Sequence, residues 1–138
     1  MLIVVDTNVL VAGLRSGGGA SRSILRQCIE GRIQPLFGTA LWLEYEDVLA
    51  RQIDELEVDA NECRAVLAAL AAVGQWVSIY FGWRPNLRDE ADNHLVELAI
   101  AGGAEVIVTH NIRDFERSEF DWPGLRIVTP AAFLEEMR

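Results

Sequence analysis

The sequence predicts an α/β fold in which helices cover both faces of a central, mostly parallel, five-stranded sheet. Short apolar runs alternate along the chain with segments whose apolar residues recur at helical spacing. The connections between these segments are short, which favours parallel strands joined by crossover helices. The chain has 138 residues, of which 51% are hydrophobic and 24% charged. A single domain over residues 1–138 is therefore expected.

Five apolar segments are predicted as strands. The first, Leu2 to Val5, is mostly β-branched, as expected of a strand buried on both faces, and polar Asp6-Thr7-Asn8 ends it abruptly. The other four are predicted at Ile33–Phe37, Trp76–Phe81, Glu105–Thr109 and Leu125–Val128.

Five further segments are predicted as helices, beginning at Ser21, Thr39, Asp59, Asp92 and Thr129. Thr39 is a suitable N-cap, and Asp59 with Glu62 resembles a capping box. Pro130 suits the first position of the last helix. Glycines are expected to end three of the helices, at Gly31, Gly74 and Gly102. The run Gly17-Gly18-Gly19 predicts a loop before the first helix.

The charged residues exclude several classes of function. The formal net charge is -9, and all 12 basic residues are arginine. An acidic balance counts against general electrostatic binding to nucleic acid or to an anionic membrane. Without lysine, the chain lacks an essential residue of P-loop, kinase, Schiff-base and pyridoxal phosphate chemistry.

The sequence also predicts a cytoplasmic location. The first residues lack the basic region of a signal peptide, and no apolar stretch reaches the roughly 18 residues that span a bilayer. Cys28 and Cys63 lie far apart within helical patterns, so we expect buried, reduced thiols.

Acidic residues are predicted to gather at one edge of the sheet. Asp6 follows the first strand, Thr109 and Asp114 come at or after the end of the fourth, and Asp89 and Asp92 stand at the start of a helix. Ligands bind outside the carboxyl ends of strands in such sheets. Carboxylates that converge there repel one another unless a cation lies between them. Several oxygen ligands predict a hard-cation site for Mg²⁺ or Mn²⁺.

Each acidic residue also has an ordinary structural alternative. Asp6 and Asp114 can cap local turns, and Asp89 with Asp92 can form the N-cap of a helix. Spacing alone assigns Glu44 to a solvated acidic face with its neighbours Glu46 and Asp47. His94 and His110 are isolated, and we assign them ordinary polar or capping roles. The tryptophans do not recur at a common helical or strand spacing, and we assign them to the core and to interfaces.

Five segments, taken together and in order, resemble the motifs of PIN-domain ribonucleases. The resemblance rests on Asp6-Thr7-Asn8-Val9-Leu10, Glu44 to Leu49, Arg88 to Gly103, Val108 to Phe115 and Thr129 to Leu134. It covers essentially the whole chain. The subgroup it resembles is that of stand-alone PIN proteins described as toxin components of toxin–antitoxin modules, similar to VapC-type toxins.

This resemblance implies an endoribonuclease dependent on Mg²⁺ or Mn²⁺. Carried over residue by residue, it implies four acidic metal ligands, Asp6, Glu44, Asp92 and Asp114. It thereby replaces the solvated-face assignment of Glu44. Residues that would orient these ligands or bind the phosphate are Thr7, Asn8, Asp89, Thr109 and Asn111. The implied partners are an RNA substrate, a cognate antitoxin and a second copy of the chain in a homodimer, without a membrane.

One departure from the family leaves an alternative open. Many members carry aspartate where this chain has Asn111, so one charge near a second metal is missing. The alternative is a catalytically weakened PIN-fold module that binds RNA or protein. A phosphatase of the haloacid-dehalogenase type fits poorly, because Asn8 replaces its second aspartate and its lysine is absent.

Two charged segments suggest where partners bind. Arg15, Arg22 and Arg26 lie beside the glycine run, and arginine suits phosphate, so we expect them to contact RNA. The segment Glu44 to Glu62 holds eight acidic residues against Arg51 alone. It suits a basic partner, and an ordinary solvated helix surface is the alternative.

Overall fold

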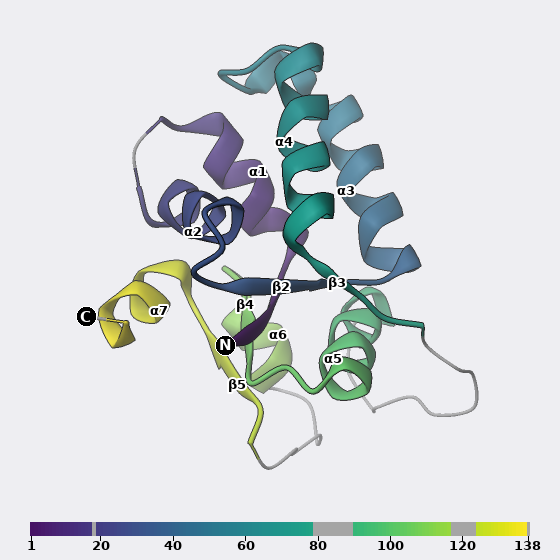
Figure 1. The fold of residues 1–138 in the computed structure, drawn as a ribbon, viewed down its shortest axis with the longest axis vertical. Helices are drawn as coiled ribbons and strands as arrows, with labels where there is room; N and C mark the ends of the chain where they lie inside the picture. The colour runs from purple at the N-terminus through teal and green to yellow at the C-terminus, as the bar shows by residue number, and fades with distance from the viewer. Residues whose placement is uncertain (18, 79–89, 117–123, 138) are drawn as a thin grey trace.

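The predicted α/β class is confirmed by a computed structural model, shown in Figure 1. It describes residues 1–17, 19–78, 90–116 and 124–137, without the side chains of residues 90–93, 114 and 116. Five strands form one sheet in the order β3-β2-β1-β4-β5, and every neighbouring pair is parallel. The first and fourth strands of the chain are therefore neighbours at the centre of the sheet.

The strands are short and mostly lie where the sequence predicts them. Their bounds are Leu2–Val5 (β1), Gln34–Phe37 (β2), Gln75–Trp76 (β3), Val106–Val108 (β4) and Arg126–Val128 (β5). The third was predicted at Trp76–Phe81, but β3 ends at Trp76, and Val77 and Ser78 are not part of a strand. Residues 79–81 of that prediction lie outside the described residues. Residues of β1 and β4, such as Ile3, Val4 and Ile107, are completely buried.

Helices cover both faces of the sheet, as predicted. Their bounds are Thr7–Arg15 (α1), Ala20–Ile29 (α2), Thr39–Arg51 (α3), Ala60–Val73 (α4), Glu90–Gly102 (α5), Ile112–Glu116 (α6) and Pro130–Glu136 (α7), with a short 3-10 helix at Ile53–Glu55. In Figure 1, α1 to α4 lie on one side of the sheet and α5 and α6 on the other. Within the described residues, no helix is long and apolar enough to cross a membrane.

Most of the predicted helix ends are confirmed. Asp59 and Glu62 form the capping box of α4, and Thr129 caps α7 through the backbone N–H of Ala132. The prediction for Thr39 is wrong, because Gly38 occupies the N-cap position and Thr39 is the first residue of α3. Gly38 takes this place because it follows β2 directly in extended conformation, and its carbonyl accepts a hydrogen bond from the backbone N–H of Trp42 at 3.0 Å.

Helix α1 was not predicted from apolar spacing. It buries Thr7, Val9, Leu10, Val11, Gly13 and Leu14, so almost all of its sides are covered and no polar stripe marks one face. Its packing against α2 is close: a Cβ atom on Gly13 would lie 2.6 Å from Leu25 Cδ1. An apolar run this short is compatible with either a strand or a buried helix, and only the packing decides between them.

Candidate active site

The candidate site lies where β1 and β4 end side by side. Val5 is paired with Val108, so the next residues of the two strands, Asp6 and Thr109, come together at the carboxyl edge of the sheet. The backbone N–H of Asp6 donates to Val108 O at 3.0 Å, which continues the pairing by one residue. The predicted convergence of these two segments is therefore present in the fold.

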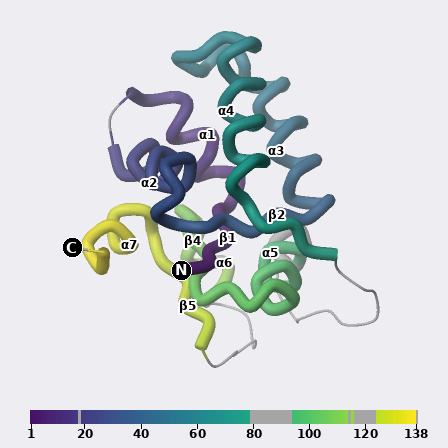
Figure 2. The backbone as a smooth tube through the Cα atoms, viewed as in Figure 1, coloured from purple at the N-terminus to yellow at the C-terminus, as the bar shows by residue number. Residues whose placement is uncertain are grey.

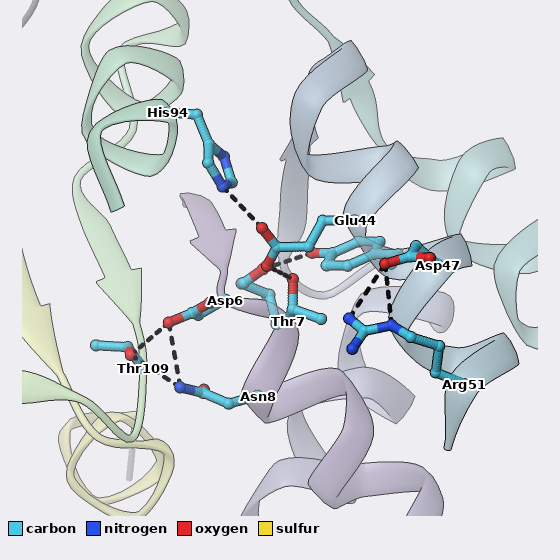
Figure 3. A network of polar contacts seen from close by, with 10 residues as sticks. Asp6, Thr7, Asn8, Glu44, Asp47, Arg51, His94 and Thr109 are labelled. Carbon is cyan, nitrogen blue, oxygen red and sulfur yellow. Dashed lines mark hydrogen bonds and ion pairs between the residues drawn. The ribbon is translucent and has the colours of Figure 1, made fainter. Parts of the chain in front are cut away.

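Asp6 is buried and held by two side chains. Its Oδ2 accepts hydrogen bonds from Thr109 Oγ1 at 2.7 Å and from Asn8 Nδ2 at 3.2 Å. Asp6 occupies the N-cap position of α1, yet its side chain makes no capping hydrogen bond. The carboxylate points toward Thr109 and Asn8, as Figure 3 shows.

Glu44 approaches from α3 and is held by two other side chains. Thr7 Oγ1 donates to Glu44 Oε1, and His94 Nε2, from α5, lies 3.1 Å from Glu44 Oε2. Glu44 does not share the exposed face of its neighbours: 35% of its side chain is exposed, against 66% for Asp47, which pairs with Arg51. Figure 3 shows this pair away from Asp6.

The surroundings shift the pKa values of the two carboxylates in opposite directions. Burial raises the pKa of Asp6, and the charge of Glu44 raises it further, against the hydrogen bond from Thr109. The hydrogen bond with His94 lowers the pKa of Glu44, and Thr7 adds to that effect, against partial burial. Two neighbouring carboxylates, one of them buried, form an anionic site that a cation would stabilise. Oxygen donors of this kind fit a hard divalent ion such as Mg²⁺ or Mn²⁺.

The other predicted acidic ligands are described only in part. Asp92 lies near the start of α5 and Asp114 within α6, but their side chains, like the whole of Asp89, lie outside the described residues. The contact of His94 with Glu44 places the beginning of α5 beside the site. Among the side chains that the structure does describe, no group of three His, Cys, Asp or Glu residues is arranged to hold a metal ion.

A cavity of about 460 Å³ opens over Asp6 and Glu44. Its lining includes most of the described residues that were predicted to act here, and it consists of Asp6, Thr7, Asn8, Val11, Ala12, Arg15, Glu44, Val48, Gln52, His110 and Asn111. Thr109 lies beneath the cavity, completely buried, and its Oγ1 accepts a hydrogen bond from the backbone N–H of Asn111 at 3.0 Å.

Two of the predicted RNA-binding arginines line a different cavity. Arg22 and Arg26 border a hollow of about 340 Å³ formed by residues of α1, α2 and α4. Arg22 also makes a hydrogen bond within the fold, in which its Nε donates to Gly13 O at 2.7 Å. Of the three arginines, only Arg15 lines the cavity over Asp6.

Both histidines lie at the site, although the sequence led us to assign them ordinary polar or capping roles. His94 contacts Glu44, which lies 50 residues away, and His110 lines the cavity with its Nε2 3.3 Å from Ser21 Oγ. No spacing rule relates α3 to α5, so the sequence offers no signal for the contact of His94. His110 directly follows the fourth strand, and that position is the signal that would have indicated it.

Comparison with known proteins gives a family match and a structure of similar fold. Residues 2–113 match the family described as PIN domain. A similar solved structure is "Crystal structure of VapBC2 from Rickettsia felis bound to a DNA fragment from their promoter", in which one chain has 15% sequence identity and a TM-score of 0.58. The match covers 94% of this chain and 98% of that chain, and it shows similarity of fold. No curated protein matches the sequence.

The opposite pKa shifts predict opposite effects of neutralising the two carboxylates. A raised pKa means that Asp6 loses stabilisation as pH rises through its folded pKa. Asp6→Asn should therefore raise Tm near pH 7, by about 3 °C for each kcal/mol gained, with the gain disappearing in acid. Glu44→Gln should lower Tm near pH 7, because the lowered pKa of Glu44 stabilises the fold above its unfolded pKa. Thermal unfolding from pH 3 to 8 measures both, and Tm shifts of equal sign would contradict this account.

The contact of His94 with Glu44 predicts a measurable change in the Glu44 carboxyl group. His94→Ala removes the hydrogen bond that most lowers the pKa of Glu44, so that pKa should rise. His94→Gln retains a donor and should have a smaller effect. A ¹³C NMR titration of the side-chain carboxyl carbons measures this, with His110→Ala as the matched control. An unchanged Glu44 pKa in His94→Ala would show that the contact is absent in solution.

Proposed function

The chain belongs to the PIN-domain family, whose members are generally nucleases, and we propose that it is an endoribonuclease dependent on Mg²⁺ or Mn²⁺. The observation that carries the proposal is the pairing of Asp6 with Glu44 in one cavity at the carboxyl edge of the sheet. The charge of Glu44 acts unfavourably on Asp6 within this cavity, and a cation bound between the two carboxylates would relieve that repulsion. Residues 1–138 are proposed to form one domain. Although β5 and α7 lie after the residues that match the family, β5 pairs with β4 and α7 packs against α2.

The proposed metal ligands are Asp6, Glu44, Asp92 and Asp114. These carboxylates would hold a divalent ion, which would supply Lewis-acid chemistry for phosphodiester hydrolysis. Mg²⁺ and Mn²⁺ are both compatible with ligands that are all carboxylates. Asp89 is proposed to support Asp92 from the segment before α5.

The other polar residues of the site would position these ligands and the substrate. Asn8 is fixed at both ends of its amide, because Nδ2 donates to Asp6 and Oδ1 accepts from the backbone N–H of His110 at 3.2 Å. Thr7 and Thr109 each donate a hydroxyl hydrogen bond to one carboxylate. These contacts leave the exposed side chain of Asn111 available to a phosphate oxygen.

Two further surfaces of the protein are proposed to bind the RNA and a protein partner. Arg15, Arg22 and Arg26 are proposed to contact the RNA, with Arg15 nearest the carboxylates. The fold similarity and the motifs that resemble VapC-type toxins support a cytoplasmic toxin with a cognate antitoxin, acting as a homodimer. Of the eight acidic residues from Glu44 to Glu62, all but Glu44 are exposed and accessible to a basic partner.

Removal of the proposed ligands should abolish RNA cleavage. Asp6→Asn and Glu44→Gln should each lower the rate at least about 100-fold with Mg²⁺ or Mn²⁺, because a neutral amide holds the ion poorly. Cleavage of a mixed RNA pool, with mapped cut sites, measures this. Glu105→Gln, which neutralises an exposed carboxylate outside the cavity, is the matched control.

The same assay separates the proposal from its alternative. Thermal unfolding of each variant distinguishes loss of activity in a folded protein from loss of the fold. Cleavage that is equal in wild type and both variants would show that the site is elsewhere. RNA binding without metal and without cleavage would favour the catalytically weakened module, which Asn111 suggests.

Charge reversal on the acidic segment should weaken antitoxin binding. The double change Asp54→Lys and Glu57→Lys replaces two exposed carboxylates, so a basic partner should bind at least about 10-fold more weakly. Co-purification with a co-expressed candidate antitoxin measures the effect, with Glu105→Lys as control. Equal recovery of the partner by both variants would exclude this segment as the binding face.

A further inference from the structure

The cavity continues beyond the carboxylates, between α1 and α3. Glu44 and Val48 lie on one face of α3, and Gln52, the C-cap of that helix, follows four residues later. On α1, the facing wall runs from Asn8 through Val11 to Arg15. Figure 2 shows these two helices on the same side of the sheet, and they are in contact. Eight residues of helix from Glu44 to Gln52 span about 12 Å, so the cavity can accept more than a phosphate.

The chemistry of the walls changes along this length. Beside the carboxylates, the walls carry the polar side chains of Thr7 and Asn8. The middle is apolar, with Val11 and Ala12 on one side and Val48 on the other. Small apolar side chains on facing walls suit a flat ring, as in most small-molecule sites.

The far end of the cavity presents hydrogen-bond donors. Arg15 Nη2 donates to Gln52 Oε1 at 3.1 Å, and Glu55 Oε2 lies 3.4 Å from the same nitrogen. Arginine cannot accept hydrogen bonds, so the oxygen of the Gln52 amide must face it. The NH₂ group of Gln52 therefore points away from Arg15, and Arg15 keeps N–H groups beyond those that these two contacts use. Both side chains line the cavity and carry N–H groups that these two contacts do not use.

We propose that this end of the cavity is a nucleobase subsite that selects guanine next to the scissile phosphate. This rests on the proposed function, because it assumes an RNA substrate. Guanine presents two adjacent acceptors, O6 and N7, which match the donors of Arg15 and Gln52. Adenine places an N6–H₂ donor where guanine has O6, and that group would face the donors of the subsite. An unpaired base is what a ribonuclease can insert between two walls in this way.

Substitutions at the two donors test the subsite through cleavage specificity. In a pool of random-sequence RNA, wild type should show guanine enriched at one fixed position beside the cut. Gln52→Ala, Gln52→Glu and Arg15→Ala should each reduce that enrichment about 10-fold, the value of one good base contact. The matched controls are Gln27→Ala, a helical glutamine bonded to Ser23 outside this cavity, and Arg64→Ala, an exposed arginine of α4. Both should retain the enrichment.

Two results of this assay would overturn the inference. One is cleavage by wild type with no preferred base. The other is a uniform loss of rate in Arg15→Ala, with a smaller salt dependence and unchanged enrichment, which would mean that Arg15 binds a phosphate.

If wild type cleaves no RNA, that result counts against the proposed function but not against the subsite. Binding of single nucleotides then still tests the subsite. Calorimetric titration with GMP and AMP should then show tighter binding of GMP by about 10-fold, lost in Gln52→Ala. Equal affinities for GMP and AMP in wild type would overturn the subsite.

Discussion

The pairing of β1 with β4 is the constraint on which the site depends. These strands lie side by side at the centre of a parallel sheet, so their ends meet at one edge although about 100 residues separate them. Asp6 continues the pairing by one residue, through its backbone N–H to Val108 O, and its carboxylate then meets the hydroxyl group of Thr109. The switch of strand order at β1 is also where ligands bind in such sheets.

The fold brings the carboxylates of Asp6 and Glu44 into one cavity, where they conflict electrostatically, and the surrounding residues stabilise the charge of one more than that of the other. Asp6 is buried, and its pKa is raised in spite of its hydrogen bonds, whereas His94 and Thr7 keep the pKa of Glu44 low. The fold thus maintains a charge at Glu44 and makes the charge at Asp6 costly. A divalent cation bound at this site would relieve the conflict, and the proposed metal-dependent activity rests on the same arrangement.

The proposed RNA substrate is an anionic polymer, whereas this chain is acidic. With a net charge of -9, the chain is not expected to attract RNA over its whole surface. Recognition then depends on local donors, and Arg15 and Gln52 lie in the same cavity as the carboxylates. Because α1 begins directly after Asp6 and α3 carries Glu44, the two helices that position the proposed ligands also form the walls of the proposed subsite.

The sequence by itself determined the alternation of strands and helices, the capping box at Asp59 and the polar break at Asp6, because these depend on local periodicity and turn chemistry. It failed at α1, whose buried sides show no polar stripe, and at Thr39, where the local context of Gly38 decided the cap. Spacing alone placed Glu44 on a solvated face, and only the motif resemblance assigned it to the site. The tertiary structure decided that His94 holds Glu44 and that Arg15 and Gln52 share its cavity. These relations depend on how α1, α3 and α5 pack, and contacts between distant segments leave no periodic signal in the chain.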